Sequence, residues 1–379
     1  MPIRLRLAPY FLVTLLMLLL FACAGKNATQ TQVNAGLQSS TTIPSEHNII
    51  VNYIRGTAEG TKLLLVDAQN GEMTKWQLQG HRMNDPKAPC SSSTVFRGLS
   101  WSPKRQQLLF ASDLDCQYGD YLIDKNGTVS NLNIPSLRYP QRPITVDSPR
   151  LSPDGTTVAC LDTNFKTGKG IQNVYLFDIR SKKSRQLTTL TDKQIYSLQT
   201  VIWSPDGEFL VFVALDSQKV PTVWQVKRDG NGLTMLLRDS AAQSYKLPVE
   251  ALENYKVSPD GRYLAFLASV NEKNEKAVPT IWLLDLKTKA VRQLLKPAKE
   301  PHRAVRAFDW SPDGTRLVLS AGFDANASCG LGFFGIQPHQ KCNSNTALYL
   351  INTDGSNLTR LTKIETTHDA TDTLKWLSR

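Results

Sequence analysis

The feature that most constrains this chain is a short motif, Ser-Pro-Asp-Gly, that recurs between two apolar runs. In one copy, residues 308–321 read FDWSPDGTRLVLSA. Pro fixes φ at the second turn position, Asp bonds back to the local backbone, and Gly adopts the left-handed conformation that ends the turn. The motif therefore predicts a β-hairpin, and the question is why the chain repeats it.

The same hairpin returns at a nearly constant period. Further copies read VIWSPDGEFLVFVA, YKVSPDGRYLAFLA and PRLSPDGTTVACLD, and LSWSPKRQQLLFAS is a weaker one. Successive turn serines are separated by 50, 52, 54 and 53 residues, which indicates a repeat architecture. The five serines are Ser102, Ser152, Ser204, Ser258 and Ser311.

Each repeat also contains a second pair of strands. Examples are NVYLFDIRSKKSRQLT, PTIWLLDLKTKAVRQLL and ALYLINTDGSNLTRLT, and Asn126-Gly127, Asp229-Gly230 and Asp354-Gly355 are hairpin turn pairs. One repeat therefore holds four antiparallel strands, here named A to D, with tight turns between A and B and between C and D. Four such strands in roughly 40–50 residues form a propeller blade.

Counting the strands predicts an all-β, six-bladed β-propeller over residues 48–379. Five full blades run from Val95 to Thr362. Residues 48–78 supply strands B, C and D without A, and residues 372–379 supply an A strand alone. We expect these N- and C-terminal segments to pair in one blade, because such a closure leaves no open sheet edge. The tryptophans and aliphatic residues of the hairpins should fill the spaces between blades.

The WSPDG motif, the apolar strand after it and the RxLT-like repeat endings resemble the TolB-type β-propeller family over Asn48–Arg379. The resemblance implies a six-bladed propeller in the bacterial envelope that binds other proteins. TolB itself carries an α/β domain before its propeller, whereas here a polar segment precedes the first strand. The expected function is therefore that of a propeller module without that domain.

Residues 1–22 predict a signal peptide of the lipoprotein type. Arg4 and Arg6 precede the apolar run Tyr10–Ala22, whose length and flanks fit a secretory segment. The tetrad Leu20–Cys23 resembles the bacterial lipobox, which implies that Cys23 is lipidated. The alternatives are an ordinary cleaved signal and an uncleaved anchor, although a spanning helix needs about 20 apolar residues.

Residues 23–47 are polar and predict a flexible tether between a lipid anchor and the propeller. The formal net charge of the chain is +11, which favours anionic partners such as envelope polymers, with a solvated basic surface as the alternative. We therefore expect a membrane-anchored, extracytoplasmic monomer, periplasmic where an outer membrane exists. Its partner would be an envelope protein or an anionic envelope polymer, and not nucleic acid.

The first residues of the six innermost strands should ring the mouth of the central channel. Their mixed charges have two interpretations, a set of ion pairs between blades or a polar binding site at the channel entrance, and exposed pairs contribute under about 1 kcal/mol. The six residues, each four before the tryptophan position, are Arg97, Asp147, Gln199, Glu253, Arg306 and Asp372.

The remaining cysteines suggest two disulfides and one buried thiol. Cys90 and Cys116 lie in loops beside the same blade, so a bridge between them is reasonable. Cys329 and Cys342 would close a short loop and contribute roughly 2–4 kcal/mol toward ordering it. Cys160 stands in the apolar run TTVACLD, where a buried thiol is expected.

The long loop Gly322–Thr346 of the last full repeat is the best sequence candidate for a binding site, because long loops in compact domains are usually functional or disordered. Leu331, Phe333 and Phe334 stand among glycines, and His339 follows them. The two phenylalanines could present their rings outward as interface anchors. The other interpretation is that they fold back and plug the channel mouth.

No motif for catalysis or metal binding is evident. The chain lacks a G-x-S-x-G elbow, a P-loop, an H-E-x-x-H helix and a C-x-x-C pair, and its histidines are scattered through loops. We therefore expect no catalytic residues, no metal and no cofactor. The leading hypothesis is a non-enzymatic binding or scaffold module. The alternative is an extracytoplasmic polysaccharide lyase or hydrolase with its site at the channel mouth.

Overall fold

The computed structural model divides the chain into two compact units, Met1–Leu37 and Gln38–Arg379. Every described residue belongs to the second unit, and its regular structure consists of β-strands. No described segment forms a helix long and apolar enough to cross a bilayer. The structure describes residues 39–40, 47–54, 61–76, 96–112, 114, 118–135, 147–164, 170–239, 245–246, 255–270, 279–295, 303–324, 344–362, 366–367 and 374–377.

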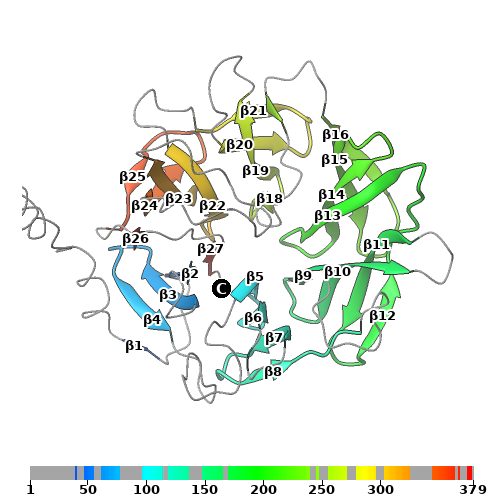
Figure 1. Ribbon diagram of the computed structural model, residues 1–379, viewed down its shortest axis with the longest axis horizontal. Coiled ribbons are helices and arrows are strands. Elements are labelled where there is room, and N and C mark those ends of the chain that lie inside the picture. The colour runs from blue at the N-terminus through cyan, green and yellow to red at the C-terminus, as the bar shows by residue number, and fades with distance from the viewer. Residues whose placement is uncertain are drawn as a thin grey trace, which may run out of the picture. The chain divides into compact units, whose positions relative to one another are not determined.

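Six sheets stand in a ring around a common centre (Figure 1), and each contains four antiparallel strands in the predicted order. The predicted six-bladed propeller is therefore confirmed. Blade 1 contains β27 (Leu374–Trp376), β2 (Asn48–Ile54), β3 (Thr61–Asp67), β4 (Met73–Trp76) and the additional β1 (Ser39–Ser40). Blade 2 contains β5 (Phe96–Ser102), β6 (Gln107–Ser112), β7 (Gly119–Ile123) and β8 (Val129–Asn131). Blade 3 contains β9 (Asp147–Leu151), β10 (Thr157–Asn164), β11 (Ile171–Asp178) and β12 (Lys183–Gln186).

The other three blades follow the same plan, each with its strand A nearest the centre, and in blade 5 this strand is β18 (Figure 1). Two short strands, one in blade 5 and one in blade 6, pair beside the main order of the sheet. Blade 4 contains β13 (Ile195–Trp203), β14 (Phe209–Asp216), β15 (Pro221–Lys227) and β16 (Thr234–Arg238). Blade 5 contains β17 (Tyr245–Lys246), β18 (Tyr255–Val257), β19 (Tyr263–Val270), β20 (Pro279–Asp285) and β21 (Val291–Gln293). Blade 6 contains β22 (Arg303–Trp310), β23 (Arg316–Asp324), β24 (Ser344–Asn352), β25 (Thr359–Arg360) and β26 (Thr366–Thr367).

Blade 1 is closed by strands from opposite ends of the propeller sequence. β27 pairs antiparallel with β2, and Ile49 lies opposite Trp376 while Val51 lies opposite Leu374. Trp376, Leu374 and the following Leu377 are all buried. The predicted pairing of the N- and C-terminal segments in one blade is therefore confirmed.

A short strand also lies within the segment expected to be a tether. β1 pairs in parallel with β4, with Ser39 opposite Lys75 and Ser40 opposite Trp76. Two residues of the expected tether, residues 23–47, thus join the outer edge of blade 1. The signal peptide and the boundary at residue 48 remain predictions, since residues 1–38 and 41–46 lie outside the described part of the chain.

The Ser-Pro-Asp-Gly turns are held by their own serines. At the blade 4 turn, the Ser204 and Phe209 backbones pair at 2.9 Å, and the Phe209 N–H also donates to Ser204 Oγ at 3.0 Å. Ser204 Oγ donates to Asp206, and Gly207 closes the turn with a φ of 77°. These bonds make each turn a rigid link between strands A and B. The same serine contacts recur at Ser152, Ser258 and Ser311.

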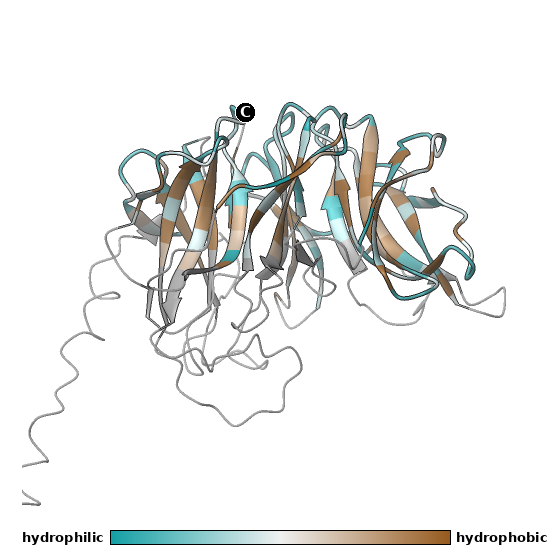
Figure 2. Cartoon of the chain, turned by 90° about the horizontal axis from the view of Figure 1, so that it is seen from above, coloured by the Kyte–Doolittle hydropathy of each residue, from teal (hydrophilic) through white to brown (hydrophobic). Residues whose placement is uncertain are grey.

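Apolar side chains fill the spaces between neighbouring blades, as predicted. Trp203 of blade 4 packs in one cluster with Leu176 of blade 3, and its indole N–H donates to the Arg150 carbonyl at 3.0 Å. The preceding Ile202 packs toward blade 5 in a cluster with Phe266. Successive residues of a strand point to opposite faces, so each blade contacts both neighbours. Figure 2 shows this as apolar colour along the strands and polar colour at the turns.

Candidate functional site

A cavity of about 180 Å³ lies at the centre of the ring, at the end where strands A turn into strands B. All six innermost strands contribute to its wall, so it is the described end of the central channel. We call it the channel cavity. Its frame is rigid because the serine-bonded turns of blades 3 to 6 carry four of its lining prolines. The turn prolines in its wall are Pro103, Pro153, Pro205, Pro259 and Pro312.

One position of the repeat sets the charge of the channel cavity. It lies directly before the tryptophan position of strand A, and all six of its residues line the cavity. In three of the six the residue is cationic, and these cations stand on alternate blades, 1, 3 and 5. From blade 1 to blade 6 the residues are Lys375, Ser100, Arg150, Ile202, Lys256 and Asp309.

Asp309 is the acidic member of this position, and it is almost completely buried, at 2% exposure. Its Oδ2 accepts a hydrogen bond from the Trp376 backbone N–H at 2.8 Å and lies 2.9 Å from the Lys375 ammonium nitrogen. The carboxylate of blade 6 therefore binds the closing strand β27 and neutralises one of the three cations.

Arg150 is a second buried charged residue in the cavity wall, at 8% exposure. Its Nη1 donates to the Pro149 carbonyl at 3.0 Å, which is a neutral acceptor. Gly98 of the neighbouring blade lies against the same guanidinium, and a Cβ there would stand 3.4 Å from Arg150 Nη1. Tyr255 also lines the cavity, and burial raises the pKa of its phenol, so the ring stays uncharged at neutral pH.

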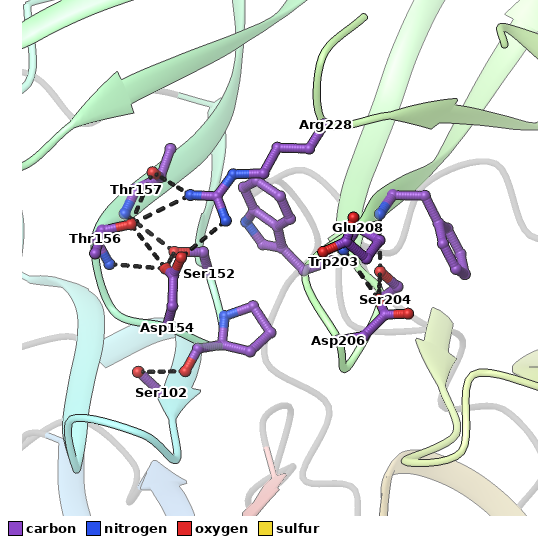
Figure 3. Close-up of polar contacts among 12 residues, drawn as sticks. Ser102, Ser152, Asp154, Thr156, Thr157, Trp203, Ser204, Asp206, Glu208 and Arg228 are labelled. Atoms are coloured by element: carbon purple, nitrogen blue, oxygen red, sulfur yellow. Dashed lines mark hydrogen bonds and ion pairs between the residues drawn. The ribbon is translucent and has the colours of Figure 1, made fainter. Parts of the chain in front are cut away.

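A second polar cluster joins blades 3 and 4 beside the turns. Arg228 Nη1 lies 2.8 Å from Asp154 Oδ2, and Nη2 donates to Thr157 Oγ1 at 2.9 Å and to Thr156 Oγ1 at 3.2 Å. The guanidinium also lies 5.3 Å from the ring centre of Trp203 (Figure 3).

The charge state of this cluster follows from the contacts of Asp154. Burial would raise the pKa of that carboxyl, but hydrogen bonds from Ser152, Arg228 and Thr156 outweigh burial and hold it well below its usual range. The residues of the cluster satisfy one another across two blades, so it joins the blades rather than presenting a free surface.

The predicted ring of strand-start residues lies toward the other end of strand A. The described A strands of blades 2, 3 and 6 each contain one extra residue relative to strand B, and that of blade 4 contains two. Gln199 and Arg306 are themselves bulged residues. Gln199 donates to Ser197 Oγ at 2.8 Å. Arg97 and Asp147 lie in β5 and β9, and the structure does not describe Glu253 or Asp372. A polar site there remains a prediction.

Several other predicted sites fall outside the described residues. Both disulfides and the lipidation site remain predictions, because the structure does not describe Cys23, Cys90, Cys116, Cys329 or Cys342. The candidate residues of the long loop also lie outside the described part of the chain, and they are Leu331, Phe333, Phe334 and His339.

Cys160 is buried as predicted, at 2% exposure, and its thiol points to the Tyr175 carbonyl at 3.8 Å. No cluster of three or more His, Cys, Asp or Glu side chains suited to a metal ion occurs within the described segments.

The channel cavity itself was not anticipated from the sequence. A usable signal was present, since aligning the copies on the tryptophan position puts a charged residue directly before it in four of six repeats. This signal alone does not identify a cavity wall, because a charged residue beside a buried tryptophan also arises from the ordinary alternation of a strand.

The comparisons with known proteins agree with this fold. A family model described as WD domain, G-beta repeat matches residues 295–329, which include strands β22 and β23 and the turn between them. The crystal structure of TolB from Acinetobacter baumannii is similar with a TM-score of 0.53 at 14% identity, over 86% of this chain and 67% of that one. A putative TolB from Agrobacterium tumefaciens gives a TM-score of 0.46 at 18% identity, over 85% and 90%.

A curated relative shares part of the sequence. The "Uncharacterized peptidase YuxL" of Bacillus subtilis (strain 168) is 32% identical over 160 residues, which are 35% of this chain. This chain covers 23% of the length of that protein. The structural comparisons support the TolB-like propeller fold that the repeats indicated.

Proposed function

We propose, on the premise that the chain has the six-bladed fold of TolB-like propellers, that it is a non-enzymatic binding module of the bacterial cell envelope. The observation that carries this proposal is the channel cavity, which six strands and four serine-stabilised turns hold in a fixed shape with charged groups in its wall. A rigid scaffold that presents charged and aromatic groups at one end is suited to recognition of a partner. The partner would be an envelope protein or an anionic envelope polymer.

The proposed location follows from the first residues of the sequence. Cys23 would carry lipid after removal of residues 1–22, and residues 23–47 would separate the propeller from the membrane. The folded domain would then be extracytoplasmic and membrane-attached. Replacing Cys23 with Ser should release the protein into the soluble fraction, because lipid chains supply about 0.8 kcal/mol of attachment per buried CH₂. A variant that stays on membranes would contradict lipidation.

Two surfaces are proposed to contact the partner, and one experiment compares them. A photo-crosslinking amino acid would replace Lys104, an exposed residue of the blade 2 turn beside the channel cavity, or Phe333 in the candidate binding loop. The matched control is Lys183, which is exposed on the outermost strand of blade 3. We expect capture of one discrete species in intact cells from position 104 or 333 and not from 183.

The same experiment separates the binding module from the enzyme alternative. Equal labelling from positions 104, 333 and 183, or no discrete product, would contradict a specific binding function. Because one relative is named as a peptidase, the purified protein should also be assayed for bound metal and for cleavage of polysaccharides and peptides. Stoichiometric bound metal together with cleavage of a polysaccharide or peptide would overturn the non-enzymatic proposal.

A further inference from the structure

An aromatic side chain stands exposed at the start of strand A in blade 4, at the opposite end of that strand from the channel cavity. Tyr196 is 62% exposed, which makes it the most exposed large apolar side chain in the described part of the chain. Its neighbours Ile195 and Ser197 pair with two successive residues of β14, so Tyr196 is a bulged residue without a partner in that strand. A bulge redirects a side chain, and bulges are frequent beside functional sites.

A cation from the B–C connection of the same blade lies over this ring. Lys219 Nζ is 4.9 Å from the ring centre of Tyr196. Among the described residues, the Lys219 ammonium has no hydrogen-bond or ion-pair partner, and neither does the Tyr196 hydroxyl. The two side chains therefore offer an exposed ring, a hydroxyl and a positive charge at one place.

The turn that carries Lys219 is fixed by Asp216. Oδ1 of Asp216 accepts the backbone N–H groups of Gln218 and Val220, both at 2.9 Å, and the Asp216 carbonyl accepts the Lys219 N–H at 2.8 Å. Arg238 Nε lies 2.9 Å from Asp216 Oδ2, and Arg238 Nη2 donates to Gln218 Oε1 at 2.7 Å. The backbone of Lys219 is thus held beside the ring before a ligand binds, which lowers the entropic cost of binding.

The surroundings of this pair favour a ligand rich in hydroxyl groups. The exposed residues of the two flanking connections, 191–194 and 217–218, are all polar or charged. A protein interface has an extended apolar centre, which this surface lacks in its described residues. A sugar needs only one aromatic ring, because the C–H groups on one side of a pyranose pack against the negative face of a π-system. A carboxylate on that sugar would pair with the ammonium.

We propose that Tyr196 and Lys219 bind an acidic sugar unit, a pyranose ring that carries a carboxylate. This inference rests on the proposed function and identifies the anionic envelope polymer as an acidic polysaccharide. It adds a third contact surface to the two proposed above. Tyr196 packs against the sugar ring, Lys219 pairs with its carboxylate, and Asp216 with Arg238 positions the turn.

The test is calorimetric titration of the purified protein with alginate oligosaccharides, which are polymers of uronate, near pH 7 at constant ionic strength. We expect saturable binding, and much weaker binding of the neutral oligosaccharide maltohexaose. Tyr196→Ala should weaken alginate binding about fivefold or more, whereas Tyr196→Phe should keep most of it because the ring remains. Lys219→Gln should remove most of the preference for alginate over maltohexaose. Tyr118→Ala is the matched control, because Tyr118 is also exposed, at 39%, and should not affect binding.

Two further measurements protect the inference from folding defects and from a response to charge alone. Melting of each variant shows whether it is folded, and polyglutamate tests an acidic polymer without sugar rings. Absence of alginate binding, equal alginate binding by wild type and Tyr196→Ala, or polyglutamate binding as tight as that of alginate would each overturn the inference. Partner capture from position 104 or 333 would then still support the proposed function, so the two failures are distinguishable.

Discussion

Polar contacts join blade 3 to blade 4 and also join blade 6 to blade 1, but the two junctions differ in how deeply their charged groups are buried. Between blades 3 and 4, the partly exposed Arg228 reaches Asp154 and two threonines from a surface turn. Between blades 6 and 1, the buried Asp309 bonds directly to the backbone of the closing strand and to Lys375. One junction uses side chains that water can reach, and the other uses a carboxylate that water cannot reach.

The difference follows from how the two blades are built. Blade 4 has four strands from one continuous segment, and β13 pairs with β14 over almost its whole length. Blade 1 takes its inner strand from the other end of the propeller, and β27 contributes only three residue pairs to β2. Because three residue pairs hold a strand weakly, the buried hydrogen bond from the Trp376 N–H to Asp309 adds to the stability of β27 in the blade. Blades 1 and 6 also approach closely at Gly71, where a Cβ would lie 2.0 Å from the Leu361 carbonyl oxygen, so only glycine fits there.

The largest expected effect comes from removing the closing strand. Deleting residues 372–379 removes Leu374, Trp376 and Leu377 from the core, and each large buried apolar side chain contributes about 1.5–3 kcal/mol. The loss should approach or exceed roughly 5 kcal/mol, which is most of the stability of an ordinary domain. We expect a collapse of the thermal transition measured by circular dichroism. Deleting only residues 378–379 is the control, and equal melting of the two truncations would contradict the closure.

A smaller effect is expected from Asp309→Asn, which keeps the shape of the side chain and removes its charge. Lys375 would then lose its ion pair beside the cavity, and breaking one partner of a buried pair costs about 3–5 kcal/mol. Because the Lys375 side chain is 23% exposed, we expect the lower end, about 3 kcal/mol, in chemical denaturation. Glu208→Gln on an exposed turn should change stability little. A loss below about 1 kcal/mol would show that β27 is held by packing alone.

The two junctions also show what the sequence could and could not predict. The turn around Ser311 was predictable, because Pro, Asp and Gly act within a few residues of one another. The closure was predictable because strand types could be counted through a fixed period.

The Asp309–Lys375 contact was not predictable in the same way. It joins residues 66 positions apart whose approach depends on six blades closing to one radius. The bulges at Gln199 and Arg306 could not be predicted from the sequence either, because one inserted residue shifts the side chains without a clear change in the apolar pattern.

The smallest effect is expected at the junction of blades 3 and 4, and its pH dependence distinguishes it from the other junction. Arg228→Gln should lower stability by about 1 kcal/mol near pH 6, because the pair is about one-third exposed and water screens it. The contacts of Asp154 hold its folded-state pKa below the unfolded value of about 3.9. The stabilisation by this carboxylate is therefore fully present above about pH 4 and is lost as pH falls through the folded-state pKa.

The difference in unfolding free energy between wild type and Asp154→Asn should therefore narrow when urea denaturation is repeated at about pH 2.5 instead of 6, because the unfolded-state carboxyl takes up a proton in that range while the folded-state carboxylate does not. Arg228→Lys keeps the charge but not the paired hydrogen bonds to Thr156 and Thr157, so it should recover only part of the loss. Arg228→Gln in the Asp154→Asn background is the matched control at pH 6, where the substitution should cost less than it does in the wild-type background. An equal cost of Arg228→Gln in the two backgrounds at pH 6 would show that Arg228 acts through its packing on Trp203 and not through Asp154.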